Sequence, residues 1–184
     1  MSSQHIESMN TPSISVYQRA MSSKKVAATI LLPLIEFEFA FNGAQKPAIT
    51  QAESNLNQLK VLFGICSTHK WTASQKISKL GNKDEYWFKL SNLGFKEIYK
   101  IAGPMADKNK DKWALLLCER AGKTEKTRFV KDDIMKAIKG TSGLSIYYIC
   151  LKTRRLPYTV SRHVSDLEKR GLIKRTPNGW IEKR

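Results

Sequence analysis

Two glutamates at the end of an apolar run are the first residues of this chain that could do chemistry. Residues 31–39 read LLPLIEFEF, so Glu36 and Glu38 follow five apolar positions with one residue between them. Carboxylate oxygens are the ligands that Mg²⁺ prefers in proteins. Three interpretations compete: a membrane segment, a buried strand that carries two charges, or a helix that delivers an acid to a site.

The membrane interpretation is the weakest of the three. The apolar stretch, residues 26–41, is too short to span a bilayer and contains both acids near its end. A long polar segment precedes it and no small-residue cleavage site follows it, which argues against a signal peptide. We therefore expect no membrane partner.

The cysteines argue against a zinc site and against a disulfide framework. Cys66, Cys118 and Cys150 lie far apart, no CxxC pair is present, and the three histidines are equally scattered. Each cysteine is expected to be a small buried apolar residue in a reducing compartment. The expected location is therefore intracellular, in the cytoplasm or nucleoid.

Strong positive charge gives the broadest indication of a partner. The 184 residues include 32 Lys and Arg against 16 Asp and Glu, a net charge of +16, and the pI is near 9.9. Such an excess favours a polyanion, with nucleic acid first and an anionic membrane surface second. A basic surface that serves only solubility is the alternative.

A second group of candidate residues lies on a predicted helix near the C-terminus. In PYTVSRHVSDLEKRG, Val160, Val164 and Leu167 recur at helical spacing and are expected to face the core. Arg162, on the outer face, can pair with both acceptors of a guanine. The residues expected to contact DNA from this face are Tyr158, Thr159, Ser161, Arg162, Ser165 and Lys169. Lys174, Arg175, Lys183 and Arg184 flank the predicted wing, where they are expected to contact phosphates. Lys152, Arg154 and Arg155 add positive charge at the turn before the helix, and Arg154 and Arg155 are expected to contact DNA.

The elements around this helix predict a winged helix-turn-helix domain over residues 129–184. Helices are expected in VKDDIMKAIKG and in LSIYYICLKTR, where Ser145 is a plausible N-cap. A hairpin around the turn Pro177-Asn178-Gly179 follows the third helix. The stretch LPYTVSRHVSDLEKRGLIKR resembles the recognition helix and wing of MarR- and ArsR-like regulators, which implies double-stranded DNA as the partner. A winged helix that contacts another protein is the alternative.

The rest of the chain predicts three further parts. Residues 1–23 are polar and aperiodic, which is typical of a disordered leader. Residues 24–122 combine helices and strands in the manner of one compact α+β domain. Residues 123–128 are charged and without apolar side chains, and are expected to be a linker.

Within residues 24–122, the predicted order is helix, two strands, helix, two strands and two helices. The first helix begins at Lys24, and FEFAFN with the turn Asn42-Gly43 predicts a strand and hairpin corner. Thr50 and Glu53 have the spacing of a capping box that opens a helix ending at Gly64. CSTHKWTASQ and YWFKL predict two antiparallel strands, and LGFKEIYKIAGP and DKNKDKWALLLCERAG predict the last two helices.

This order agrees with a motif at the opening acids. LLPLIEFEFAF resembles the LAGLIDGEGSF form of the LAGLIDADG homing-endonuclease motif. Leu31, Leu34 and Ile35 match, Glu36 replaces an aspartate, and Glu38 falls on the essential acid. The resemblance covers residues 24–122 and implies an αββαββα fold.

The resemblance also implies a site. In that family the motif helices pack at a pseudo-twofold axis, each presents a carboxylate to a divalent metal at the scissile phosphate, and the metal activates water. This implies Mg²⁺ as cofactor, Glu38 as catalytic metal ligand and Glu36 as a second candidate ligand. With one copy of the motif, cleavage of both strands needs a homodimer. The implied basic sheet face makes Lys70 and Lys89 DNA contacts and, with Gln45 and Lys46, candidates to assist the water.

Two departures from the motif leave more than one functional interpretation open. Pro33 and Phe39 stand where the family has glycines that allow close helix contact, and a proline inside a helix costs about 3 kcal/mol. The first interpretation is a site-specific DNA-binding protein and transcription regulator, with a degenerate homing-endonuclease fold and a winged-helix reader. The alternatives are a Mg²⁺-dependent endonuclease acting as a homodimer and an RNA-binding, maturase-like splicing cofactor.

Overall fold

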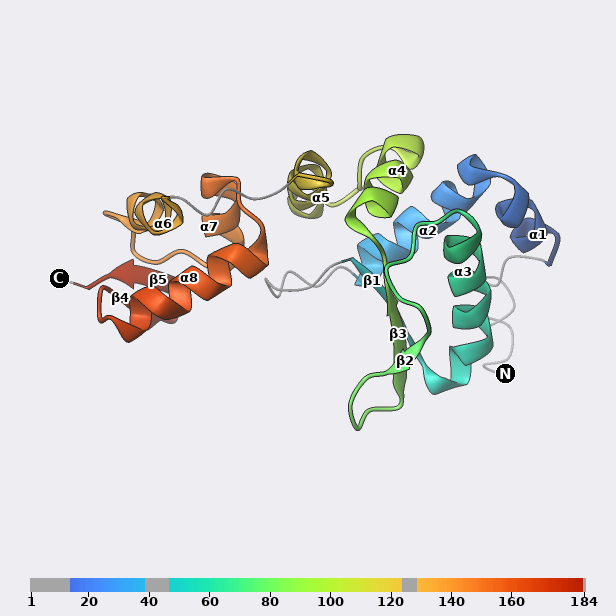
Figure 1. Ribbon diagram of the computed structural model, residues 1–184, viewed down its shortest axis with the longest axis horizontal. Coiled ribbons are helices and arrows are strands. Elements are labelled where there is room, and N and C mark those ends of the chain that lie inside the picture. The colour runs from blue at the N-terminus through green and yellow to red at the C-terminus, as the bar shows by residue number, and fades with distance from the viewer. Residues whose placement is uncertain (1–13, 39–46, 124–128, 184) are drawn as a thin grey trace, which may run out of the picture. The chain divides into compact units, whose positions relative to one another are not determined.

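The computed structural model describes residues 14–38, 47–123 and 129–183, which combine helices with two small antiparallel sheets (Figure 1). The chain divides into two compact units. Among the described residues, the first unit holds 14–38 and 48–103, and the second holds 47, 104–123 and 129–183. The α+β class predicted from the sequence is confirmed.

The first unit consists of helices around a three-stranded sheet. Its described helices are α1 (Ile14–Ser22), α2 (Lys24–Glu38), the short 3₁₀ helix η3 (Glu53–Asn55), α3 (Leu56–Thr68) and α4 (Asn92–Ala102). Its described strands are β1 (Ala48–Ala52), β2 (Ser78–Lys79) and β3 (Glu85–Lys89). They pair antiparallel in the spatial order β1-β3-β2, so the central strand is the last in the chain.

Helix α2 contributes much of the core of the first unit. Leu31 and Ile35 are fully buried and Leu32 is 5% exposed, and the small side chains Ala27 and Ala28 are fully buried beside them. One apolar face of this kind lets neighbouring elements approach closely, and α2 packs against α1, α4 and β1.

The end of α2 differs from the predicted helix-to-strand transition. The helix continues through the exposed Pro33 and ends only at Glu38. Phe37 and Glu38 are therefore helical, and the strand predicted from Phe37 onward is wrong at these two positions. The remainder of that predicted strand and its turn at Asn42-Gly43 lie outside the described residues.

The sheet of the first unit has one face against α3. Ile49 and Phe88 are directly paired and fully buried, and Phe63 of α3 meets the Phe88 ring edge to face at 5.3 Å between centroids. Side chains alternate along a strand, so the next residue, Trp87, points to the opposite face. There the Lys89 ammonium lies 4.6 Å from the centre of the Trp87 ring, and both residues are half-exposed.

Helix α1 is the largest difference from the predicted leader. Residues 14–22 are helical, and Ala20 is fully buried. His69 lies 2.7 Å from the Ala20 carbonyl oxygen through its Nε2, and the Gln58 amide lies 3.4 Å from the Tyr17 hydroxyl. The disordered leader predicted for residues 1–23 is therefore wrong over 14–22, and residues 1–13 lie outside the described part.

Two further predicted boundaries fail because distant segments meet there. Thr50 lies in β1 opposite Trp87, and Glu53 begins η3, so the predicted capping box does not form. Helix α3 does not end at Gly64 but runs on to Thr68. A Cβ added at Gly64 would lie 3.1 Å from the terminal methyl of Met21, so this glycine accommodates α1.

The strand predicted for CSTHKWTASQ is also largely wrong. Residues 66–68 complete α3, and the strand β2 begins only at Ser78. Between them, Thr72 forms an isolated bridge with Leu90, and Trp71 is 1% exposed. The strand predicted for YWFKL and the helix that follows it are confirmed as β3 and α4.

The second unit begins with α5 (Lys108–Arg120) and continues with α6 (Val130–Ile138), α7 (Ile146–Thr153), α8 (Pro157–Lys169) and a hairpin of β4 (Ile173–Thr176) and β5 (Gly179–Glu182). The predicted helices and hairpin of this region are confirmed. Helices α6, α7 and α8 pack on one another, and the hairpin contacts α6 and α8. The shared core includes Ile134, Ile149, Val160, Val164 and Ile173, each at most 2% exposed.

Helix α5 belongs to this second unit, whereas the sequence placed residues 108–122 with the first. Trp113 of α5 is 4% exposed and lies 5.7 Å from the ring of Tyr147 of α7. The Tyr147 hydroxyl donates a hydrogen bond of 2.7 Å to the carbonyl oxygen of Asn109. The compact units thus divide at residues 103 and 104, ahead of the predicted linker at 123–128.

Candidate nucleic-acid interface

Helix α8 has one buried and one exposed face. Pro157 stands in its first turn, where a missing N–H removes no helical hydrogen bond. The buried side chains are Pro157, Val160, Val164 and Leu167, as the helical spacing predicted for the last three. The exposed side chains at the opposite positions are Tyr158, Arg162, Ser165 and Lys169, with Thr159 and Ser161 half-exposed beside them.

The guanidinium of Arg162 has no hydrogen bond or ion pair with the described residues. Asp166, one turn further along the helix, is the acid that could form an ion pair with Arg162. Asp166 instead pairs with Lys131 of α6 and with Arg170, 3.2 Å away. The hydrogen bond from Lys131 and the charge of Arg170 hold the pKa of Asp166 below its usual range. Arg162 is therefore exposed to solvent with its donors available.

The two arginines of the turn between α7 and α8 have partners within the second unit. Arg155 is 13% exposed and donates to Oδ2 of Asp133 of α6 from Nε at 3.1 Å and from Nη2 at 2.7 Å. Arg154, in a left-handed conformation (φ +50°), pairs with Glu119 of α5. Lys152 lies 3.4 Å from the carbonyl oxygen of Ala137. These basic side chains therefore stabilise the second unit itself.

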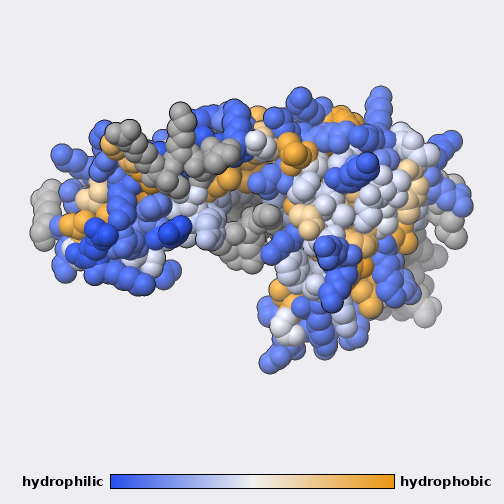
Figure 2. All heavy atoms as spheres, in the orientation of Figure 1, coloured by the Kyte–Doolittle hydropathy of each residue, from blue (hydrophilic) through white to orange (hydrophobic). Residues whose placement is uncertain are grey.

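The hairpin after α8 carries exposed basic side chains. Lys174 and Arg175 are exposed on β4, opposite Ile181 and Trp180 of β5. The backbone N–H and carbonyl of Leu144 both form hydrogen bonds with the backbone of Trp180. Leu144 thus forms an isolated antiparallel bridge beside β5. Lys183 is exposed just after β5, and Arg184 lies outside the described residues. Figure 2 shows mainly hydrophilic residues on the visible surface over α8 and the hairpin.

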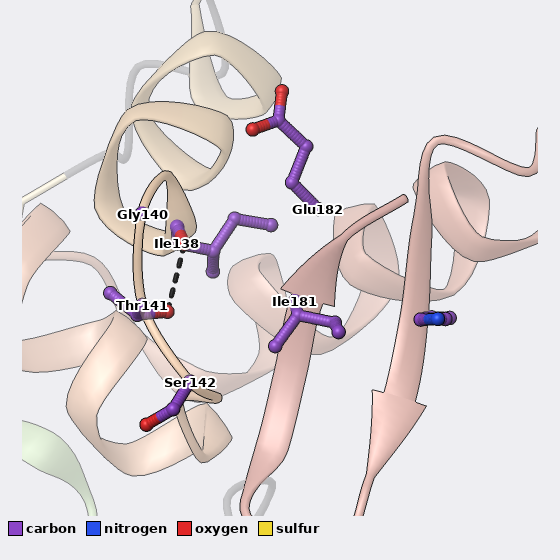
Figure 3. Close-up of a pocket in the computed structure, with 7 residues that line it drawn as sticks. Ile138, Gly140, Thr141, Ser142, Ile181 and Glu182 are labelled. Carbon is purple, nitrogen blue, oxygen red and sulfur yellow. Dashed lines mark hydrogen bonds between the residues drawn. The ribbon is translucent and has the colours of Figure 1, made fainter. Parts of the chain in front are cut away.

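A pocket of about 390 Å³ lies between the loop after α6 and the hairpin (Figure 3). Ile138 and Ile181 form its apolar part, and Lys174 and Glu182 contribute opposite charges. The Thr141 hydroxyl donates a hydrogen bond of 2.8 Å to the carbonyl oxygen of Ile138, which fixes the loop. The lining contains a single carboxylate and no histidine or cysteine, so it offers no set of metal ligands.

Of the two acids of α2, the structure describes the side chain of Glu36 alone. Glu36 is half-exposed near the end of the helix, and the side chain of Glu38 lies outside the described part of the chain, as do Gln45 and Lys46. No three acids, histidines or cysteines among the described residues come together as metal ligands. Lys70 is exposed at the left-handed turn after α3 (φ +61°), and Lys89 stacks on Trp87.

Two residues of α6 that orient α8 were not indicated by the sequence. Lys131 and Asp133, both on α6, pair with Asp166 and Arg155 and so join α6 to the middle of α8 and to the turn before it. Asp166 also pairs with Arg170 on α8, and the i,i+4 spacing of these two residues could have indicated that pair. The pairs with α6 depend on tertiary packing and have no sequence signal. His163 lies in the same cluster, where partial burial and the charge of Lys131 lower its pKa.

Comparison of the chain with models of protein families, with characterised proteins and with solved structures finds no match. None of the helices in the described ranges has the length and apolar character that crossing a membrane requires.

Proposed function

We propose that this chain binds double-stranded DNA at specific sequences and acts as a transcription regulator. The observation that carries the proposal is the outer face of α8, where Tyr158, Arg162, Ser165 and Lys169 are exposed while the opposite face is buried. A helix that offers donors and an apolar ring from one face suits the major groove, which admits an α-helix. The second unit is on this proposal a winged helix-turn-helix, with α8 as recognition helix and β4–β5 as wing.

Charge supports the same assignment. Residues 104–184 contain 20 Lys and Arg against 9 Asp and Glu, so +11 of the net +16 belongs to this part of the chain. Lys174 and Arg175 on the hairpin can contact phosphates and fix the position of α8 without reading sequence. A winged helix that contacts only protein would gain little from this excess.

The first unit is on this proposal a degenerate LAGLIDADG-like domain that contributes further DNA contacts and a dimer interface. Lys70 and the Trp87–Lys89 pair offer basic and aromatic side chains outside its core. Val26, Ile30, Pro33 and Phe37 follow one another along α2 at the 4-3-4 spacing of a helix–helix seam, half-exposed or exposed, with Phe37 85% exposed. A second copy of α2 would cover this stripe, and Phe37→Glu is then expected to convert a dimer into monomers in sedimentation experiments.

Selection from a random library of DNA duplexes tests DNA binding. The full-length protein is expected to enrich one sequence and to lose affinity steeply as salt rises. Arg162→Ala is expected to cost about 1–3 kcal/mol and to relax base preference at one position. Lys139→Ala, at an exposed lysine directly after α6 and outside the proposed interface, is the matched control and should change neither. Absence of any enriched sequence at low salt would overturn the proposal.

A Mg²⁺-dependent endonuclease is the second candidate, favoured by one observation. Helix α2 extends through Pro33 to Glu38, so the acid aligned with the motif stands at the C-terminal end of a helix, where the helix dipole favours a cation. A carboxylate oxygen is also the ligand type that Mg²⁺ prefers. Glu38 would hold the ion, with Glu36 as a second candidate ligand, and the metal would supply an activated water.

Sequencing of DNA ends separates the two candidates. The protein is incubated with the duplex library and Mg²⁺, and Glu38→Gln is the matched variant because it keeps the size of the side chain. Ends that appear with the wild-type protein and vanish with Glu38→Gln would establish the nuclease. Specific binding without new DNA ends would exclude the nuclease and support the transcription regulator.

A further inference from the structure

The exposed face of α8 changes chemical character along its length. Tyr158, Arg162, Ser165 and Lys169 follow at intervals of four, three and four residues, so they form one stripe opposite the buried face. From the N-terminal end the stripe offers an aromatic ring, a guanidinium, a small hydroxyl and an ammonium. In a helix-turn-helix the N-terminal residues of the recognition helix contact base edges. Tyr158 and Arg162 are therefore the two positions that can determine sequence preference.

Arg162 is available for a base because its neighbours are paired elsewhere. Asp166, the acid one turn away, is held by Lys131 and Arg170. A guanidinium presents two parallel donors, and the guanine edge in the major groove presents two acceptors, O6 and N7. No other base offers this pair of acceptors there, so Arg162 discriminates for guanine.

Tyr158 stands one turn before Arg162 with its ring in solvent. It is 70% exposed, and its side chain has no hydrogen bond with the described residues. An exposed ring at this position offers apolar surface, and the apolar group of the major groove is the C5 methyl of thymine. Four residues advance about 6 Å along a helix, which is less than two base-pair steps of about 3.4 Å.

We propose that α8 reads a thymine and a guanine no more than two base pairs apart, with the Tyr158 ring against the thymine methyl and the Arg162 guanidinium on guanine O6 and N7. This inference rests on the proposed DNA binding and specifies its substrate. The selected sequence therefore contains this pair in each half-site. Ser165 and Lys169, further along the stripe, contribute contacts that do not choose between bases.

Single-atom changes in the DNA test each contact. In the duplex enriched by the full-length protein, each thymine is replaced in turn by uracil, which lacks only the methyl group. Each guanine is replaced in turn by 7-deazaguanine, which lacks the N7 acceptor. At one position uracil is expected to weaken binding about fourfold, the value of one buried methyl group. At a position no more than two base pairs away, 7-deazaguanine is expected to weaken it at least fivefold.

Protein variants assign the two effects to residues. Tyr158→Ala should bind thymine and uracil duplexes equally, and Tyr158→Phe should keep the preference because the ring makes the contact. Arg162→Ala should bind the guanine and 7-deazaguanine duplexes equally. Lys169→Ala is the matched control on the same face, and it should weaken all duplexes by one common factor.

Three results would overturn the inference while leaving DNA binding intact. One is that the base substitutions cost the variants as much as they cost the wild type. Another is that the sensitive thymine and guanine lie more than two base pairs apart. The third is that Tyr158→Phe loses affinity for all duplexes equally, which would assign its hydroxyl to a phosphate. A library that yields no enriched duplex would overturn the proposed function and this inference together.

Discussion

Gly179 allows the hairpin to pack closely against the backbone of Leu144. It has φ +117°, and a Cβ added there would lie 2.3 Å from the carbonyl carbon of Leu144. Gly179→Ala is therefore expected to lower the free energy of unfolding by about 3 kcal/mol or more, since both backbone strain and a backbone contact oppose the methyl group. Urea titration followed by fluorescence measures the loss.

Gly140 is the matched control for this prediction. It also has a positive φ (+71°), but an added Cβ there would meet no atom within 4 Å. Gly140→Ala should therefore lower the free energy of unfolding by about 1–2 kcal/mol, the strain of a left-handed conformation at a residue with a Cβ. Equal losses in the two variants would contradict close packing of the hairpin against Leu144.

Cys66 predicts how stability responds to alkaline pH. It is fully buried, and burial raises the pKa of its thiol to about 12. An unfolded cysteine loses its proton near pH 8.5. Above that pH the thiol ionises only in the unfolded chain, which lowers the free energy of the unfolded state. The free energy of unfolding should therefore fall by about 1.4 kcal/mol per pH unit until the folded pKa is reached.

Comparison with Cys66→Ala isolates this contribution, because the other titrating groups are common to both proteins. Between pH 8 and pH 10 the wild-type protein should lose about 2 kcal/mol more than the variant. Parallel stability curves would show that the thiol ionises in the folded protein. A native protein that reacts at Cys66 with a small alkylating agent at pH 8 would show the same.

At the scale of elements, the ion pairs of α6 determine how α8 is held. Asp133 accepts two hydrogen bonds from Arg155, which is 13% exposed, so Asp133→Asn removes the negative charge from a nearly buried ion pair. The variant is expected to lose about 1–3 kcal/mol of stability. Its sequence discrimination on DNA should fall as well, because the turn before α8 loses its support.

Asp132 provides the comparison, since it is exposed on the same helix and has no partner among the described residues. Asp132→Asn removes the same charge from the same turn and should leave stability and discrimination within experimental error. A similar effect of both substitutions would attribute the loss to the charge of α6 and not to the pair with Arg155.

The same elements show what the sequence can and cannot predict. Helix α8 was predictable because its core residues repeat at helical spacing, and Ser145 was recognisable as an N-cap that does accept from the Tyr148 backbone N–H. Helix α1 was not, because its polar sequence becomes helical through packing on α2 and α3. The error at Gly64 followed from this: the glycine makes room for an α1 that the sequence did not indicate.

Thr50 illustrates a different limit. Its spacing to Glu53 suits a helix start, but pairing with β3 over five residues extends the backbone there. Strand pairing depends on partners distant in sequence, and it overrides a local capping signal. The candidate site divides in the same way, since the exposed face of α8 follows from periodicity, whereas the internal partners of Arg154 and Arg155 follow from tertiary packing.

At the scale of the whole molecule, the uneven charge predicts how each unit would contribute to the proposed DNA binding. Residues 1–103 contain 12 Lys and Arg against 7 Asp and Glu, whereas 104–184 contain 20 against 9. Each phosphate contact contributes about 0.9 to the slope of log affinity against log salt concentration. Replacing Lys174 and Arg175 with glutamine should therefore lower this slope by about 1.8.

If both units contact one duplex, Lys70→Gln with Lys89→Gln should lower the slope by a similar amount, and the four substitutions together should lower it by about 3.6. Lys136→Gln with Lys139→Gln removes two exposed charges, one on α6 and one directly after it, outside the proposed interface and should leave the slope unchanged. Fluorescence anisotropy on the enriched duplex at several salt concentrations measures the slope for the wild-type protein and the four variants. An unchanged slope for the Lys70 and Lys89 variant would confine the phosphate contacts to the second unit, because charge that does not touch the phosphates releases no counterions.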